Sequence, residues 1–460
     1  MTATVDRTTH PAPDEAPLTL DTDVVPPQPL GFRDQFAFWA NLGVSLLGFG
    51  GALLILQPVG FDPLPLFAAL LAALVGTVVG ALMVALATLP GARTGAPSMA
   101  LLRGLFGTKI SYLPTALNVL QLIGWGTFEL FIIAEAAEAL TDGFGPRWVY
   151  IVGAGIVTTI MTIWPLGLIR LLRRYVTVAV FVAMAYFTVV LLREGLPDFS
   201  GGSWRGFLPA VDIALAVAIS WVPLASDYSR FSRTPSRAFW SVLTGFTVTS
   251  VWTFWLGLLA LSTVGNDPTK VFTAFTEAGS GVVTGLALLA FGVLTVREVD
   301  QSFANVYSTA VSTQNITPRV DRRILCAVIG VVITALALAV DFTTYANFLY
   351  LIGSVFLPMF AVLIVDYFFG AGRRGWNLAP DAPSRWLMLL PWLGGFVTYQ
   401  LINPGSVSAW VDFWTSVRDA IGFTPQSWMS ASLFSFLVAA ALTWLVVGLT
   451  EREGRLTSPR

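Results

Sequence analysis

The sequence predicts an all-α integral membrane protein with twelve membrane-spanning helices. Of its 460 residues, 55% are hydrophobic and only 12% are charged, and the mean hydropathy is +0.73. Soluble domains carry about 25% charged residues, so half that share cannot cover a water-facing surface over this length. Long apolar runs recur along the chain, and the basic residues between them alternate between two sides.

The apolar runs define the spans. A helix that crosses roughly 30 Å of hydrocarbon needs about 20 residues, and the runs from Gln35 onward approach or exceed that length. In chain order they are 35–57, 64–89, 112–140, 147–167, 172–193, 210–228, 238–263, 280–311, 324–341, 345–370, 386–403 and 428–449.

The two ends of the chain lack such runs. Residues 1–30 hold six prolines and several carboxylates, a composition typical of a disordered tail. They contain no basic segment followed by a short apolar core, so we expect no cleavable signal peptide. Residues 451–460 form a second polar tail, and the prediction is one transmembrane domain over 31–450.

The basic residues orient the spans. With this count of helices, 20 of the 26 lysines and arginines fall on one side and five on the other, while Arg297 lies inside a span. Cytoplasmic loops of membrane proteins carry the excess of basic residues. The pattern predicts a multi-pass protein of the cytoplasmic membrane with both termini in the cytoplasm.

Composition also excludes several classes. Cys326 is the single cysteine and lies in an apolar run, which excludes a disulfide scaffold. The single histidine, His10, is in the N-terminal tail, so histidine metal clusters and intramembrane histidine relays are excluded. A net charge of −1 gives no reason to expect nucleic acid. No carboxylate cluster suggests a membrane enzyme, and we predict no enzymatic activity and no cofactor.

Two spans are predicted to be broken. The first carries Gly48, Gly50 and Gly51, three glycines in four positions, where helix propensity is lowest. The sixth carries Pro223 after Ser220 and Trp221, and proline disrupts the preceding helical turn. Glycine and proline also serve close packing and kinks in membrane helices, which is the alternative interpretation.

The spacing of the two breaks predicts an internal repeat. Interrupted helices at corresponding positions of two halves indicate a transporter of inverted repeats with its site at the interrupted helices. We therefore expect one repeat over 35–193, a second over 210–370 and two extra helices over 386–449. Gly50 is assigned to the solute site and Gly48 to a cation site.

The third span presents a polar face. Gln121, Trp125 and Glu129 follow one another at intervals of four residues and so share one side of a helix. This face suits the binding of a planar polar ring: the indole would stack on the ring, and the amide and the carboxylate would form hydrogen bonds with its edge. A polar clamp between helices is the alternative.

The eighth span is the most polar. Glu298, Asn305 and neighbouring hydroxyls form one stripe, while Arg297 and Asp300 share another. A carboxylate in hydrocarbon is paired, protonated or bound to a cation. Asp300 is therefore predicted to be either a proton or Na⁺ site or the partner of Arg297.

Five motifs resemble the nucleobase:cation symporter-1 family, the purine-cytosine permeases. They are GARTGAPSMALLRGLFG at 91–107, QLIGWGTFEL at 121–130, SDYSRF at 226–231, FANVYS at 303–308 and LPMFAVLIVDYFFG at 357–370. The resemblance implies a LeuT-type fold with a 5+5 inverted repeat and two extra C-terminal helices. It implies cytosine, purines, hydantoins, uracil or allantoin as solutes.

The resemblance also implies roles for single residues. Trp125 matches the family's stacking tryptophan and Asn305 its solute-binding asparagine, while Ser220 and Trp221 are the nearest matches in the sixth span. Two departures stand out. Sodium-coupled members use two hydroxyl side chains in the eighth span, where this chain has Val299 and Asp300. Members often have glutamine where this chain has Glu129.

The predicted function is secondary active import of a nucleobase or related heterocycle, coupled to H⁺ or Na⁺, by alternating access. Substrate-binding residues are expected to be Gln121, Trp125, Glu129, Ser220, Trp221, Glu298, Asn305 and Gly50, with Asp300 and Gly48 at the cation site. An ionised carboxylate only accepts hydrogen bonds, so Glu129 favours an amino-substituted ring over a diketo ring such as uracil. The alternative is a symporter of the same fold for an amino acid or a pyrimidine vitamin precursor. Oligomeric state stays open.

Overall fold

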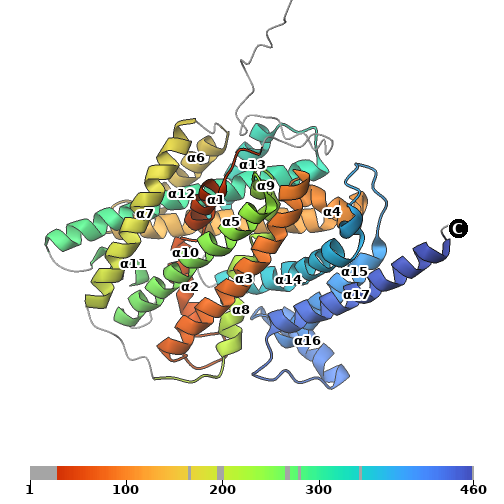
Figure 1. Cartoon of the computed structure of the whole chain (residues 1–460). Helices are drawn as coiled ribbons and strands as arrows, with labels where there is room; N and C mark the ends of the chain where they lie inside the picture. The colour runs from red at the N-terminus through yellow and green to blue at the C-terminus, as the bar shows by residue number, and fades with distance from the viewer. Residues whose placement is uncertain are drawn as a thin grey trace, which may run out of the picture.

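The computed structural model describes residues 28–163, 167–193, 201–264, 270–277, 281–340 and 344–457, with only the backbone of 167–175 and 451–457. Within these ranges every regular element is helical (Figure 1). The elements are α1 (Phe32–Leu42), α2 (Leu46–Leu56), α3 (Leu66–Thr94), α4 (Ser98–Phe106), α5 (Thr108–Leu140), α6 (Arg147–Ile163), α7 (Gly167–Arg193), α8 (Phe207–Ile219), η1 (Val222–Leu224), α9 (Ala225–Ser229), α10 (Pro235–Thr263), α11 (Val271–Thr276), α12 (Val282–Ile316), α13 (Arg322–Ala337), α14 (Tyr345–Phe369), η4 (Ala371–Arg374), η5 (Trp386–Met388), α15 (Leu389–Ile402), α16 (Ser408–Ile421) and α17 (Ala431–Thr457).

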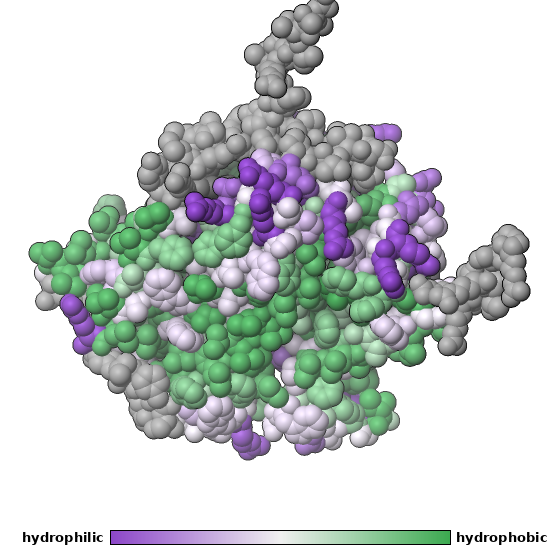
Figure 2. Space-filling model, viewed as in Figure 1, coloured by the Kyte–Doolittle hydropathy of each residue, from purple (hydrophilic) through white to green (hydrophobic). Residues whose placement is uncertain are grey.

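Each of the twelve predicted spans coincides with helix. Among the described residues, eight helical stretches are long and apolar enough to cross a membrane, and the bent pair α1–α2 makes a ninth. The shorter helices α6, α13 and α15 occupy the other three predicted ranges. Apolar side chains cover the middle of the molecular surface, and hydrophilic ones gather toward one end (Figure 2). This is the surface expected of a protein whose solvent is a bilayer.

The first span is broken, but the predicted position of the break was wrong. α1 and α2 meet at an angle of 60° around residues 43–45, and the glycines at 48, 50 and 51 lie inside α2. Ser45 begins α2 as its N-cap, accepting a hydrogen bond of 3.1 Å from the Leu47 amide. Gly43 packs so closely on α10 that a Cβ would lie 2.8 Å from the Phe246 carbonyl oxygen. Capping and interhelical packing therefore set the break, not helix propensity.

The second break lies where the sequence predicts it. α8 ends at Ile219, the 3₁₀ turn η1 contains Pro223, and α9 resumes at Ala225. Proline supplies no amide for the regular helical pattern, so the chain tightens into 3₁₀ geometry at this point. The helices ahead of the two breaks, α1 and α8, have 11 and 13 residues. The interruptions thus fall at corresponding depths in spans 1 and 6.

The spans pack in two groups. The two broken spans associate with α3 and α10, and α3 lies against both α8 and α10. α5 and α12 pack along each other, and α6 and α13 flank them. The C-terminal helices α15 and α17 form a further unit with α14 at one side of the molecule (Figure 1). The two broken spans therefore face α5 and α12 across the interface between the first two groups.

Among the described residues, three α-helices lie outside the predicted spans, α4, α11 and α16, as does the short 3₁₀ helix η4. The tails also differ in extent from the predicted ones. Leu30 forms an isolated bridge with Ser232, so the last residues of the predicted tail 1–30 are attached to the domain, while 1–27 lie outside the described residues. α17 continues to Thr457 and takes in most of the predicted C-terminal tail, of which 458–460 lie outside the described residues.

Candidate solute-binding site

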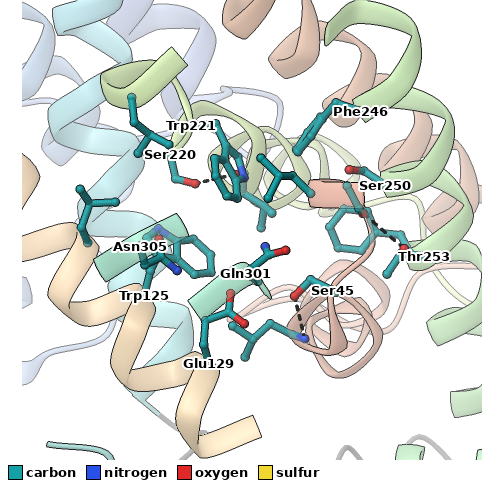
Figure 3. Close-up of a pocket in the computed structure, with 18 of the residues that line it drawn as sticks. Ser45, Trp125, Glu129, Ser220, Trp221, Phe246, Ser250, Thr253, Gln301 and Asn305 are labelled. Atoms are coloured by element: carbon teal, nitrogen blue, oxygen red, sulfur yellow. Dashed lines mark hydrogen bonds between the residues drawn. The ribbon is translucent and has the colours of Figure 1, made fainter. Parts of the chain in front are cut away.

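A cavity lies between the two helix groups, next to both breaks (Figure 3). Its volume is about 30 Å³, which suffices for one or two water molecules but not for a heterocycle. One wall comes from the first break and α10, a second from the other break, and a third from α5 and α12. The polar and aromatic side chains that line it are Ser45, Trp125, Glu129, Ser220, Trp221, Phe246, Ser250, Thr253, Phe254, Gln301, Asn305 and Tyr345.

The structure brings most of the predicted site residues to this cavity. Trp125, Glu129, Ser220, Trp221, Asn305 and Gly48 all line it. Gln121, Glu298, Asp300 and Gly50 are not among the lining residues. The first three take part in hydrogen bonds behind the wall, and Gly50 is buried within α2.

Glu129 is the principal unpaired acceptor of the cavity. The residue is 0% exposed, and neither carboxylate oxygen has a hydrogen-bond partner among the described residues. Its carboxylate is directed into the cavity toward Gln301 (Figure 3). A buried polar group without a partner is costly, so such a group calls for a functional explanation. Glu129 is thus positioned to accept hydrogen bonds from a ligand.

Two indoles border the same space. Trp125 lies edge-on to Tyr345 and Phe348, with ring centroids 6.0 and 5.3 Å apart. Trp221 lies edge-on to Trp39, with centroids 6.2 Å apart. The Trp125 Nε1 donor is buried without a partner among the described residues. Each indole is thus held in T-shaped contacts with neighbouring rings, an arrangement favoured by the quadrupoles of the rings.

Gln121 supports the second break from behind. Its side-chain amide donates to the Ser220 carbonyl oxygen at 3.0 Å and to Asn118 Oδ1 at 3.0 Å. The Ser220 hydroxyl in turn donates to the Val217 carbonyl oxygen at 2.7 Å. A carbonyl released by the helix break is therefore satisfied by an amide from α5, as buried backbone groups require.

Arg297 supports the first break in the corresponding way. Its Nη2 donates to the Asn41 carbonyl oxygen in the last turn of α1 and, at 2.6 Å, to Gln301 Oε1. Its Nε donates to Asn41 Oδ1 at 3.3 Å. Arg297 forms an ion pair with Glu298, at 3.1 Å. Arg297 and Glu298 are adjacent in sequence. Residues that share a face of a helix are three or four positions apart, so helical spacing does not predict this pair.

The rest of this network links the break to both carboxylates. The Ser45 hydroxyl donates to Glu298 Oε1 at 2.8 Å, and the Asn41 side-chain amide donates to Asp300 Oδ2 at 3.0 Å. Sequence analysis missed Asn41, Ser45 and Gln301. The available signal was the two polar residues four positions apart, on either side of Gly43, in an otherwise apolar run.

Two helix breaks beside a buried cavity with aromatic and carboxylate lining are typical of a secondary transporter. Residues 31–378 match the family of permeases for cytosine/purines, uracil, thiamine and allantoin. The chain belongs to this family. It is therefore a membrane permease and not an enzyme, and the predicted family is confirmed.

Relatives and solved structures agree with this assignment. The putative purine-cytosine permease YxlA of Bacillus subtilis (strain 168) is 26% identical over 363 residues, 73% of this chain and 76% of that protein. The hydantoin permease of Microbacterium maritypicum is 26% identical over 298 residues, 58% of this chain and 60% of that protein. The structure of Mhp1, a nucleobase-cation-symport-1 family transporter in a closed conformation with bromovinylhydantoin bound, has a TM-score of 0.73 at 17% identity and covers 96% of this chain and 97% of that one. This likeness confirms the predicted fold class.

Proposed function

We propose that this permease carries a nucleobase or a related heterocycle together with a cation, and that the cavity beside the two breaks is its solute site. The observation that carries the proposal is the buried Glu129 carboxylate, which has no partner among the described residues, in a cavity also lined by Trp125 and Trp221. A flat ring with polar edges fits the indoles and the carboxyl group together. The indoles would contact the faces of the ring, and the Glu129 oxygens would accept hydrogen bonds from its N–H groups.

The chemistry of the walls selects the solute's edge. Glu129 presents two carboxyl oxygens without partners among the described residues, so we expect it to accept hydrogen bonds from a ring edge that carries N–H groups. Gln301 and Asn305 line the cavity from α12 and add amide donors and acceptors. Cytosine, adenine or an aminopyrimidine offers such an edge, whereas uracil offers fewer donors. The free carboxylate of an amino acid would present acceptor oxygens to the Glu129 oxygens, which disfavours that alternative.

The size of the cavity implies a conformational change. A volume of about 30 Å³ excludes a ring, so the walls separate before solute enters. The two broken spans pack with α3 and α10, whereas Trp125, Glu129 and Asn305 belong to α5 and α12. Movement of one group relative to the other opens the cavity without breaking the contacts inside either group. Alternating access at a midplane site has this form.

The orientation of the spans in the membrane is inferred from the positions of the lysines and arginines. The excess of basic residues on one side of the spans supports a cytoplasmic membrane protein with both termini in the cytoplasm. The hydrophilic side chains gathered toward one end of the surface agree with this orientation (Figure 2).

Binding of a ring panel to purified protein tests the proposal. Cytosine, adenine, hypoxanthine, uracil, hydantoin and an aminopyrimidine are added separately, and the unfolding temperature is followed. A ligand that binds only the folded protein raises this temperature. We expect stabilisation by at least one amino-substituted ring and none in a Glu129→Ala variant. A rise with an amino acid and with none of the rings would contradict the proposal.

A further inference from the structure

The last turn of α1 is the place where a broken-helix transporter holds a cation. Carbonyl groups at the C-terminal end of a half-helix lack their usual helical partners and carry the negative end of the helix dipole. In transporters with discontinuous helices such ends coordinate the coupling cation. Here the relevant carbonyl is that of Asn41, which accepts from the backbone amides of Gly43 and, at 3.3 Å, of Val44.

A side chain of the protein fills this place. The Arg297 guanidinium donates to the Asn41 carbonyl oxygen and to its side-chain oxygen. Two further acceptors complete its surroundings: Glu298, at 3.1 Å, and Gln301, at 2.6 Å. Arg297 is 1% exposed, and a guanidinium cannot lose its proton in a protein. The last turn of α1 therefore faces a permanent positive charge that belongs to the chain.

At the second break, a neutral side chain satisfies the backbone carbonyl that the helix break releases. There the Ser220 carbonyl oxygen is satisfied by the neutral amide of Gln121, from span 3. Arg297 belongs to span 8, the counterpart of span 3 in the second repeat. The two supports thus occupy equivalent places, and only the one at the first break carries a charge.

The residues at the first break do not suit Na⁺. Oxygen ligands from several groups would have to converge on the ion, but the Asn41 carbonyl and side-chain oxygens already accept from Arg297. A second cation would be repelled by the guanidinium, and Glu298, the carboxylate that could attract it, is already paired with Arg297. Val299 and Asp300 stand where the family resemblance leads one to expect two hydroxyls. In the part of the chain that the structure describes, no three Asp, Glu, His or Cys side chains form a group able to hold a metal ion.

We propose that the Arg297 guanidinium is a tethered cation that takes the place of Na⁺ at the first helix break, so that solute binding and transport do not require Na⁺. The inference rests on the proposed transport function in one respect: its uptake measurement requires that the protein transports a heterocycle. Of the two coupling cations, Na⁺ and H⁺, the proton is then the one that remains.

The first test compares NaCl with choline chloride at equal ionic strength and pH, using purified wild-type protein in proteoliposomes. We expect uptake of the stabilising ring to agree within about twofold between the two salts, and the unfolding temperature without solute to be the same. A tenfold loss of uptake in choline, or a rise in unfolding temperature specific to Na⁺, would overturn the proposal. The unfolding measurement needs no solute, so it decides the inference even if no heterocycle is transported.

The second test removes the charge. Arg297→Ser exposes the Asn41 carbonyl, Glu298 and Asp300 to a vacated volume, and we expect uptake to become at least tenfold dependent on Na⁺ or on millimolar guanidinium. Arg297→Lys is the matched control, because it keeps a cation and should gain no such dependence. A folded Arg297→Ser protein that stays inactive with every added cation, or equal dependence in both variants, would contradict the proposal. If Arg297→Ser does not fold, the comparison of salts on the wild type decides.

Discussion

Replacing Glu129 with glutamine tests the carboxyl group separately from the size and shape of the side chain. Glu129→Gln keeps the side-chain volume, so the buried wall of the cavity stays filled. It replaces one of two acceptor oxygens, neither of which has a partner among the described residues, by an NH₂ group that only donates. A hydrogen bond to a charged group contributes about 1.5–3 kcal/mol. Loss of one such bond to the ring corresponds to roughly ten- to 150-fold weaker binding.

Isothermal calorimetry with the ring that stabilises the wild type measures this loss, and uptake normalised to membrane abundance measures its consequence. Glu138→Gln is the matched control: it makes the same chemical change on α5, at a partly exposed position that does not line the cavity. We expect the control to bind as the wild type does. Binding by Glu129→Gln within twofold of the wild type would refute the assignment of Glu129 to the solute site.

The remaining predictions concern stacking and packing. Trp125→Ala should weaken ring binding by about five- to 150-fold, since a stacked base contributes about 1–3 kcal/mol, and Trp125→Phe should lose less; both are measured by calorimetry. Gly43→Ala should lower the unfolding temperature, at a cost of about 1–3 kcal/mol, because its Cβ would overlap α10. Gly292→Ala, whose Cβ would meet nothing within 4 Å, should not. Asp366→Asn should cost about 1.5–3 kcal/mol, because it removes the charge of the buried carboxylate to which the partly exposed Arg385 donates at 2.6 Å, and thermal unfolding checks this.

Hydrophobic periodicity and charge sufficed to predict the spans, because in a membrane each helix satisfies its own backbone and needs only length and apolarity. The position of the first break required tertiary information. A glycine run lowers helix propensity, but in this chain those glycines allow α2 to approach its neighbours, and a Cβ on Gly48 would lie 2.7 Å from Thr253. The cap at Ser45 fixes the break instead.

The site also has residues that the sequence predicts and residues whose roles require tertiary information. Trp125 and Glu129 could be predicted because they share one face of a single helix and stand out by type. The role of Gln121 could not be, because its partner is a carbonyl of another helix 99 positions away. Nor could the sequence show that Arg297 reaches Asn41, since which helices meet at the break depends on how the two groups pack.

The most direct test of the account is solute counterflow in proteoliposomes loaded with unlabelled ring and supplied with a trace of the labelled compound outside. Counterflow reports alternating access at the solute site without an imposed ion gradient. The account predicts accumulation of label with at least one amino-substituted heterocycle, equal in Na⁺ and choline, and its loss in Glu129→Ala. Accumulation of an amino acid and of no heterocycle, or undiminished accumulation in Glu129→Ala, would contradict it.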